Sequence, residues 1–180
     1  GSGEPDEAEK DLFQALIDNG TTIVAAMGNE RQYGSPTSYP AAIPGVIAVG
    51  ATSVDDKVAN FSNYGDHISI SAPGVAIWST LPTYPGQAEF EAVRGDGGGW
   101  VLGRPIPRDT DYAAWDGTSM ATPHVTAAVA LLIANQGGSD PQTVRDTLMK
   151  TADRVPAMGR HKFDPDYGAG RLNLLNLLQE

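Results

Sequence analysis

The chain has 180 residues, which is enough for one ordinary domain or a large part of one. With 41% hydrophobic and 19% charged residues, it is expected to fold around a buried core rather than to remain disordered. A formal charge of -10 disfavours nucleic acid and anionic membrane surfaces as partners, and the absence of cysteine excludes disulfides, thiolate metal sites and a cysteine nucleophile.

The first part of the chain contains one helix signal and several apolar runs. A helix is predicted with Pro5 in its first turn and a stop signal at Asn19-Gly20. Its apolar stripe comprises Leu12, Phe13, Leu16 and Ile17. Unbroken apolar runs follow at residues 22–27, 46–49 and 67–71. Each run is typical of a strand that is buried on both faces, as in a parallel sheet.

The second part is mostly helical, apart from one polar stretch. Residues 82–112 contain several prolines, mixed charge and three consecutive glycines, and are predicted to form a long surface loop or insertion. A helix is expected over residues 119–136, which are rich in Ala, Val, Leu and Ile and precede a double glycine. Another helix should begin at residues 139–141 (SDP), with its proline at the first helical position. The leucines of residues 172–178 indicate a last helix.

This alternation of helices and strands predicts an α/β layered architecture. Three apolar strands are too few to bury one another, because parallel strands need covered faces and paired neighbours. We therefore expect the sheet to continue into a segment of chain outside these 180 residues.

Residues 117–124 (GTSMATPH) place a serine at the start of a helix, directly after a glycine turn. Backbone N–H groups without intrahelical partners and the positive end of the helix dipole lie at such a position. They can stabilise negative charge on a substrate carbonyl oxygen. On this evidence alone, the simpler interpretation is that Thr118 or Ser119 caps the helix.

The same residues closely resemble the nucleophile motif of the subtilisin family of serine peptidases, and other segments match that family in order. Residues 24–30 (VAAMGNE) are similar to its oxyanion-asparagine segment, and residues 39–50 (YPAAIPGVIAVG) to the segment that lines its specificity pocket. The further similar segments are FSNYG (61–65) with SAPG (71–74), and YGAGRLN (167–173). The resemblance covers nearly all of the chain except residues 82–112.

The resemblance implies a fold and two site residues. The fold would be part of a three-layer, parallel-sheet subtilisin-like domain, of which residues 1–180 form the C-terminal portion with an insertion at about 82–112. Ser119 would be the nucleophile of a serine endopeptidase, and the amide of Asn29 would bind the oxyanion together with the Ser119 backbone N–H. Taken alone, an asparagine after a glycine would simply stabilise a turn. A cis bond before Pro40 is also expected.

A serine nucleophile needs a base, normally a histidine oriented by a carboxylate. The family's aspartate and histidine motifs have no counterpart here. His124 is expected to pack within its helix, and His67 and His161 to be solvated or locally hydrogen-bonded. The base would then come from a missing N-terminal segment or companion chain, and this chain alone would be inactive. The alternative is a catalytically silent peptide-binding or scaffolding domain on the same fold.

The expected partners are that N-terminal part and a peptide or protein substrate, with neither nucleic acid nor membrane. No cofactor is required for the chemistry; structural calcium is common in the family, but no ligand can be named here. Residues 82–112 either shape the leaving-group side of the cleft or form a tolerated surface insertion. The composition leaves specificity and compartment open, with a slight preference for a secreted protein.

Overall fold

The computed structural model describes residues 3, 5–138 and 140–179. The chain divides into two compact units. The first comprises Gly1–Ala76 and Asp116–Glu180, and the second comprises Ile77–Trp115. In the described part of the chain, no helix is long and apolar enough to cross a membrane.

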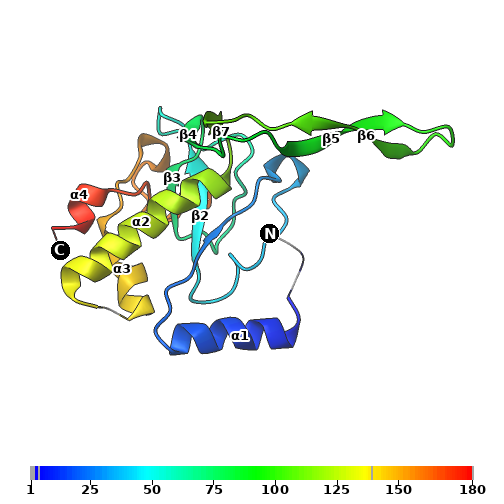
Figure 1. Ribbon diagram of the computed structural model, residues 1–180. Coiled ribbons are helices and arrows are strands. Elements are labelled where there is room, and N and C mark those ends of the chain that lie inside the picture. Colours follow the sequence, from blue (N-terminus) through cyan, green and yellow to red (C-terminus); the bar gives the residue numbers. More distant parts are fainter. Residues whose placement is uncertain (1–2, 4, 139, 180) are drawn as a thin grey trace. The chain divides into compact units, whose positions relative to one another are not determined.

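The first unit contains a parallel sheet of three strands in the order β1-β2-β3 (Figure 1). These strands are β1 (Val24–Ala26), β2 (Ile47–Thr52) and β3 (Ile70–Pro73). In register, Val24 lies opposite Ile47, and Val49 lies opposite Ile70. Every residue of the central strand β2 is buried. The predicted parallel, buried strands are therefore confirmed, although β1 is shorter than its apolar run and β3 begins later than predicted.

Among its described residues, the first unit also has four α-helices and two 3-10 helices. The α-helices are α1 (Glu7–Asp18), α2 (Thr118–Gln136), α3 (Pro141–Thr151) and α4 (Leu174–Leu177), and the 3-10 helices are η1 (Arg31–Tyr33) and η2 (Pro156–Met158). The helix predicted at residues 119–136 is confirmed. The last helix is shorter than predicted, and Asn173 caps it by accepting a hydrogen bond from the Asn176 N–H at 2.9 Å.

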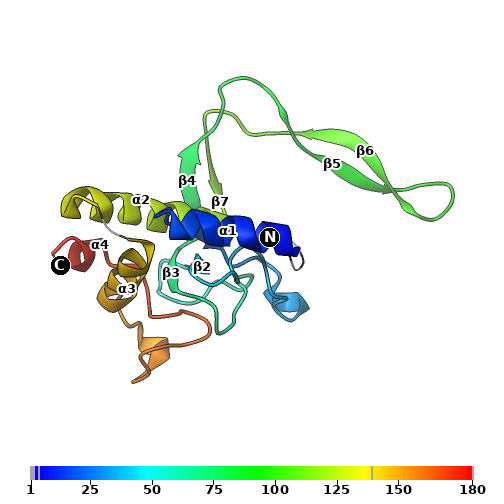
Figure 2. The ribbon, with the colours of Figure 1, turned by 90° about the horizontal axis from the view of Figure 1, so that it is seen from below.

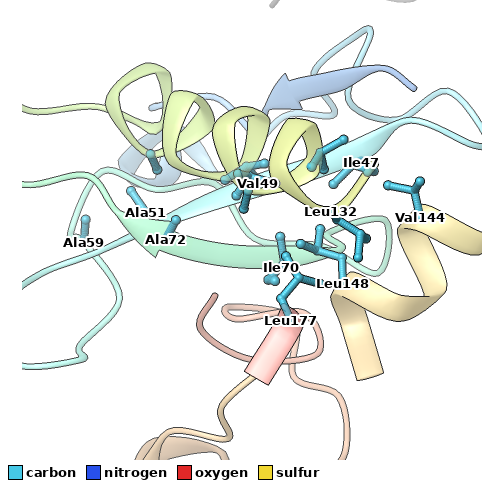
Figure 3. Close-up of a cluster of buried hydrophobic side chains, with 14 residues drawn as sticks. Ile47, Val49, Ala51, Ala59, Ile70, Ala72, Leu132, Val144, Leu148 and Leu177 are labelled. Atoms are coloured by element: carbon cyan, nitrogen blue, oxygen red, sulfur yellow. The ribbon is translucent and has the colours of Figure 1, made fainter. Parts of the chain in front are cut away.

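One face of the sheet packs against α2. Odd-numbered residues of β2, such as Val49, contribute to this core together with Ile70 of β3. Leu132 of α2, Leu148 of α3 and Leu177 of α4 meet over Ile70, as Figure 3 shows. Each of these leucines is fully buried. Burial of such a side chain stabilises a fold by about 1.5–3 kcal/mol, so this cluster holds the three helices to the sheet.

The opposite face of the sheet carries a second apolar cluster. It includes Met27, Ala48 and Ile68, with Phe13 and Ile17 of α1 packed against them. Successive side chains of a strand point to opposite faces, so Ala48 faces α1 while its neighbours face α2. Helices thus cover both faces of the sheet.

The start of α1 and its apolar stripe differ from the prediction. Asp6 is the N-cap, and its side chain accepts a hydrogen bond from the Glu9 N–H at 2.8 Å. Pro5 therefore precedes the helix instead of lying in its first turn. Leu12 and Leu16 are 58% and 40% exposed, so the stripe is only partly used for packing. The stop at Asn19 is confirmed.

Two proline predictions hold. The peptide bond between Tyr39 and Pro40 is cis. Pro141 opens α3, and the side chain of Asp140 caps that helix by accepting from the Thr143 N–H at 3.0 Å. Ser139, which belonged to the predicted start signal, lies outside the described residues.

The second unit is built from antiparallel strand pairs, so the loop alternative for residues 82–112 is wrong, whereas the insertion at about 82–112 stays a prediction. The strands are β4 (Ile77–Thr80), β5 (Gln87–Arg94), β6 (Trp100–Pro107) and β7 (Tyr112–Trp115). Strand β4 pairs with β7 and β5 pairs with β6, as Figures 1 and 2 show. The glycines that suggested a loop form the turn of the β5–β6 hairpin, where the Gly95 N–H donates to the Gly99 carbonyl at 2.9 Å.

Candidate active site

Ser119 is the second residue of α2, and its side chain is exposed. The preceding N-cap, Gly117, donates its N–H to the Gly74 carbonyl at 2.8 Å. Gly74 must be a glycine for this approach, because a Cβ there would lie 2.7 Å from the Gly117 carbonyl oxygen. The end of β3 therefore holds the start of α2 in place. Within the described residues, the Ser119 hydroxyl has no hydrogen-bond partner and is available for another group.

Asn29 follows β1, and its side chain meets the start of α2. Its Oδ1 accepts two hydrogen bonds from Thr118, one from the backbone N–H and one from the hydroxyl, each at 2.9 Å. The Thr118 hydroxyl in turn accepts from the Gly28 N–H at 3.1 Å. Two donors facing Oδ1 determine which way the amide points, so the Nδ2 group is directed away from Thr118.

The Asn29 Nδ2 and the Ser119 backbone nitrogen border the same small space. Each lies 3.6 Å from the point that a Cβ on Gly117 would occupy. Neither of these two N–H groups has an acceptor within the described part of the chain. Two unpaired donors that lie close to one point can bind a negatively charged oxygen.

The first turn of α2 explains why the Ser119 N–H is free. The Thr118 N–H donates to Asn29, and the N–H groups of Met120 and Ala121 donate to the Gly117 carbonyl at 3.0 and 3.3 Å. The Ser119 N–H has no intrahelical acceptor, as is usual at a helix start. The helix dipole makes this end of α2 favourable for negative charge.

The structure brings together both residues that the sequence singled out, and it adds Thr118. From the sequence alone, Thr118 is predicted only as a possible helix cap. Its contact with Asn29 joins residues 89 positions apart in the chain, so no local pattern could reveal it. The one sequence signal was its place beside Ser119.

None of the three histidines hydrogen-bonds to Ser119. His124 is exposed, and its Nδ1 lies 3.0 Å from the Met120 carbonyl, so its predicted packing role is wrong. His67 is half-buried, and its Nε2 is buried with no hydrogen-bond partner among the described residues, so neither solvation nor local hydrogen bonding holds for this atom. Burial lowers the pKa of His67, an effect that the nearby Asp66 partly opposes. His161 is exposed, as predicted.

A shallow, mostly apolar cavity of about 560 Å³ runs beside Ser119 along α2 and the edge strand β1. Its lining includes Val24 and Ala26 of β1 and Pro123, Ala127 and Ala130 of α2. A parallel edge strand and an apolar helix surface normally pack against further chain. The site therefore lies beside an uncovered apolar surface.

The described residues offer no obvious metal site. Over residues 3, 5–138 and 140–179, no group of three or more His, Cys, Asp or Glu side chains could hold a metal ion. Calcium is also bound by backbone and amide carbonyls, so the structural calcium suggested by the resemblance stays a prediction, and no step of the chemistry is assigned to a metal.

Together, the parallel sheet, the helices on both faces and a helix that begins beside a strand-end asparagine define a subtilisin-like α/β protein. Residues 1–170 match the sequence profile of the subtilase family, so the chain belongs to that family.

Curated relatives share about a third of their aligned residues with this chain. It is 37% identical to a subtilisin from Bacillus pumilus over 169 residues, which are 93% of this chain and 50% of the relative. It is 35% identical to subtilisin NAT from Bacillus subtilis subsp. natto, covering 93% of this chain and 36% of the relative.

Solved structures agree with this assignment. Fervidolysin from Fervidobacterium pennivorans, a keratinolytic enzyme related to subtilisin, superposes with a TM-score of 0.76 at 32% identity, covering 98% of this chain and 25% of that structure. The prenylagaramide maturation protease PagA superposes with a TM-score of 0.71 at 28% identity, covering 99% of this chain and 56% of that structure. The chain thus spans half or less of the two curated relatives and just over half of the PagA structure.

Proposed function

We propose that this chain forms the nucleophile and oxyanion-binding part of a serine endopeptidase, with Ser119 as nucleophile and Asn29 as oxyanion donor. The observation that carries the proposal is that the Asn29 Nδ2 and the Ser119 nitrogen, both without an acceptor among the described residues, lie close to one point at the start of α2. Membership of the subtilase family supports peptide-bond hydrolysis as the reaction and a peptide or protein as the substrate.

In this proposal the Ser119 oxygen attacks the carbonyl carbon of the scissile peptide bond while its proton passes to the triad histidine. The carbonyl oxygen becomes an oxyanion and accepts hydrogen bonds from Asn29 and from the Ser119 backbone. The C–N bond then breaks, and the leaving amine takes the proton from the histidine. Water, activated by the same histidine, hydrolyses the acyl-enzyme and frees Ser119.

We propose that the triad aspartate and histidine come from another segment of the same catalytic domain, either joined to this chain or held as a separate chain. The exposed apolar residues on one side of α2 support this, because Ala127, Ala130 and Leu131 lie open to solvent. The unpaired side of β1 supports it as well. The two curated relatives described above are at least twice as long as the stretch matched here.

A catalytically silent peptide-binding domain is the second candidate. One observation favours it: in the described part of the chain, no histidine or carboxylate hydrogen-bonds to the Ser119 hydroxyl. The two candidates differ in whether that hydroxyl becomes a nucleophile in the complete protein.

A fluorophosphonate probe tests the proposal, because it reacts only with an activated serine. The complete protein should be labelled at Ser119, the Ser119→Ala variant should not be labelled, and residues 1–180 alone should show no labelling. Ser79→Ala, which changes an exposed serine of β4, is the control and should label like the wild type. A complete, folded protein that does not react would exclude the peptidase and leave the binding domain.

A further inference from the structure

Asn63 lies in the loop between β2 and β3 and is 1% exposed. All of its side-chain hydrogen bonds reach one stretch of chain around Asn29. Its Nδ2 donates to the carbonyls of Met27 and Pro36 at 3.1 and 3.2 Å and to the Glu30 carboxylate at 3.0 Å. Its Oδ1 accepts from the Glu30 N–H at 2.7 Å. Replacing a buried amide whose donors and acceptor are all hydrogen-bonded destabilises the fold, because its partners lose their hydrogen bonds.

Glu30 extends this contact to Asn29. The Glu30 Oε2 that accepts from Asn63 also accepts from the backbone N–H of Asn29 at 2.8 Å. The Asn63 backbone N–H adds a hydrogen bond to the Gly28 carbonyl at 3.0 Å. The residues before and after Asn29 are therefore both bound to Asn63.

Gly28 shows how closely Asn63 approaches the turn. A Cβ on Gly28 would lie 2.5 Å from the Asn63 Nδ2 and 2.6 Å from the Glu30 Oε2, distances that no side chain tolerates. Gly28 also has a φ of 101°, which favours glycine. The turn that carries Asn29 is thus held from one side by Asn63 and Glu30. Thr118 holds the Asn29 side chain from the other side.

We infer that Asn63 is a positioning residue for the oxyanion donor and acts on it through Glu30 and the Gly28–Glu30 turn. This inference rests on the proposed function of Asn29. Asn63 does not contact the proposed space for the oxyanion; it sets where the Asn29 amide lies. A misplacement of about 1 Å in a catalytic group can cost on the order of 10²-fold in rate.

The test is a double-mutant cycle in the complete protein. Asn63→Ala should lower kcat for a peptide amide by about tenfold with little change in KM, because the donor acts mainly in the transition state. In an Asn29→Ala background, the same substitution should leave kcat nearly unchanged, since there is no donor left to position. An equal loss in both backgrounds, or an effect on KM alone, would overturn the inference.

Ser71→Ala is the matched control, because Ser71 is also buried but donates to the Gly170 carbonyl, away from Asn29. It should lower stability without lowering kcat. Amide hydrogen exchange gives a readout apart from activity: the Asn29 N–H should lose protection in Asn63→Ala, and retained protection would count against the inference. If Asn63→Ala does not fold, Asn63→Ser carries the same expectations. A wild type without activity would refute the proposed function, whereas an active wild type with an unaffected Asn63→Ala would refute only this inference.

Discussion

At Asn29, an amide flip would place an NH2 group opposite two donors of Thr118. The observed orientation avoids this clash of donors, since Oδ1 accepts both hydrogen bonds. Loss of the corresponding donor costs about 10²–10³ in kcat in a subtilisin, a magnitude measured on that relative rather than inferred from this structure. The backbone N–H and the hydroxyl of Thr118 thus together orient the group on which the proposed chemistry depends.

His67 should make stability depend on pH. Burial lowers its pKa below the ordinary value of 6.5 in the fold, so the unfolded chain binds the proton more readily. Stability from this residue is present above pH about 6.5 and is lost as the pH falls from there toward the folded-state pKa. Urea unfolding at pH 7.5 and 5.5 should show a smaller loss of stability in His67→Gln than in the wild type.

The control for this measurement is His161→Gln, because His161 is exposed. That variant should keep the wild-type pH dependence. A His67→Gln protein with an unchanged pH dependence would show that the burial of the imidazole has no energetic consequence for folding.

Among the elements, α2 combines a packing role with a chemical one. Its inward face is anchored by Ala121, Val125 and Leu132, which are buried against the sheet. Pro123 lacks an N–H, so it leaves the Ser119 carbonyl without its usual helical donor near the helix start. The inward face of the helix is therefore packed on the sheet, and the first turn, where Ser119 lies, has unpaired backbone groups.

The role of the predicted insertion at about residues 82–112 can be tested directly by deletion. Strand β7 ends at Trp115, shortly before Ser119 in the sequence, which motivates the hypothesis that the insertion shapes the leaving-group side of the cleft. Deleting residues 86–110 removes the β5–β6 hairpin. In the complete enzyme, this deletion should lower kcat/KM for peptides extended on the leaving-group side. It should leave kcat/KM for a small chromogenic amide unchanged.

The small amide serves as the internal control, because its leaving group does not extend along the cleft. Equal kcat/KM values for the extended peptide before and after deletion would identify the hairpin as a tolerated surface insertion. An equal loss of kcat/KM for both substrates would indicate damage to the fold and would also contradict a role specific to the leaving-group side.

At the scale of the molecule, the uncovered apolar surface beside β1 and α2 predicts different behaviour for this chain alone and for the complete protein. The cavity there is lined mostly by apolar atoms, including those of Ala130, and the next residue of α2, Leu131, is 47% exposed. Exposed apolar patches bind the dye ANS. Residues 1–180 should give stronger ANS fluorescence than the complete protein at equal concentration.

Leu131→Gln in the isolated chain should reduce that fluorescence, because it removes part of the patch. Equal ANS binding by the isolated chain and the complete protein would contradict the proposal that another segment covers this surface.

Much of this architecture could be predicted from local signals. The apolar runs located the three parallel strands, and the capping residues Asn19 and Asp140 located two helix ends. The hairpin of residues 87–107 was missed, because its glycine-rich turn and its prolines obscured the strands on either side. Pro105 and Pro107 are tolerated there, since a two-stranded hairpin leaves each strand with an unpaired side.

The sequence by itself determined the family, the order of the main elements and the two candidate residues Ser119 and Asn29, because periodicity, caps and motifs depend on residues close together in the chain. Only the tertiary structure decided that Phe13 rather than Leu12 packs on the core, and that Thr118 and Asn63 hold the Asn29 turn. Those contacts join residues 89 and 33 positions apart, and their geometry exists only once the strands and helices have packed.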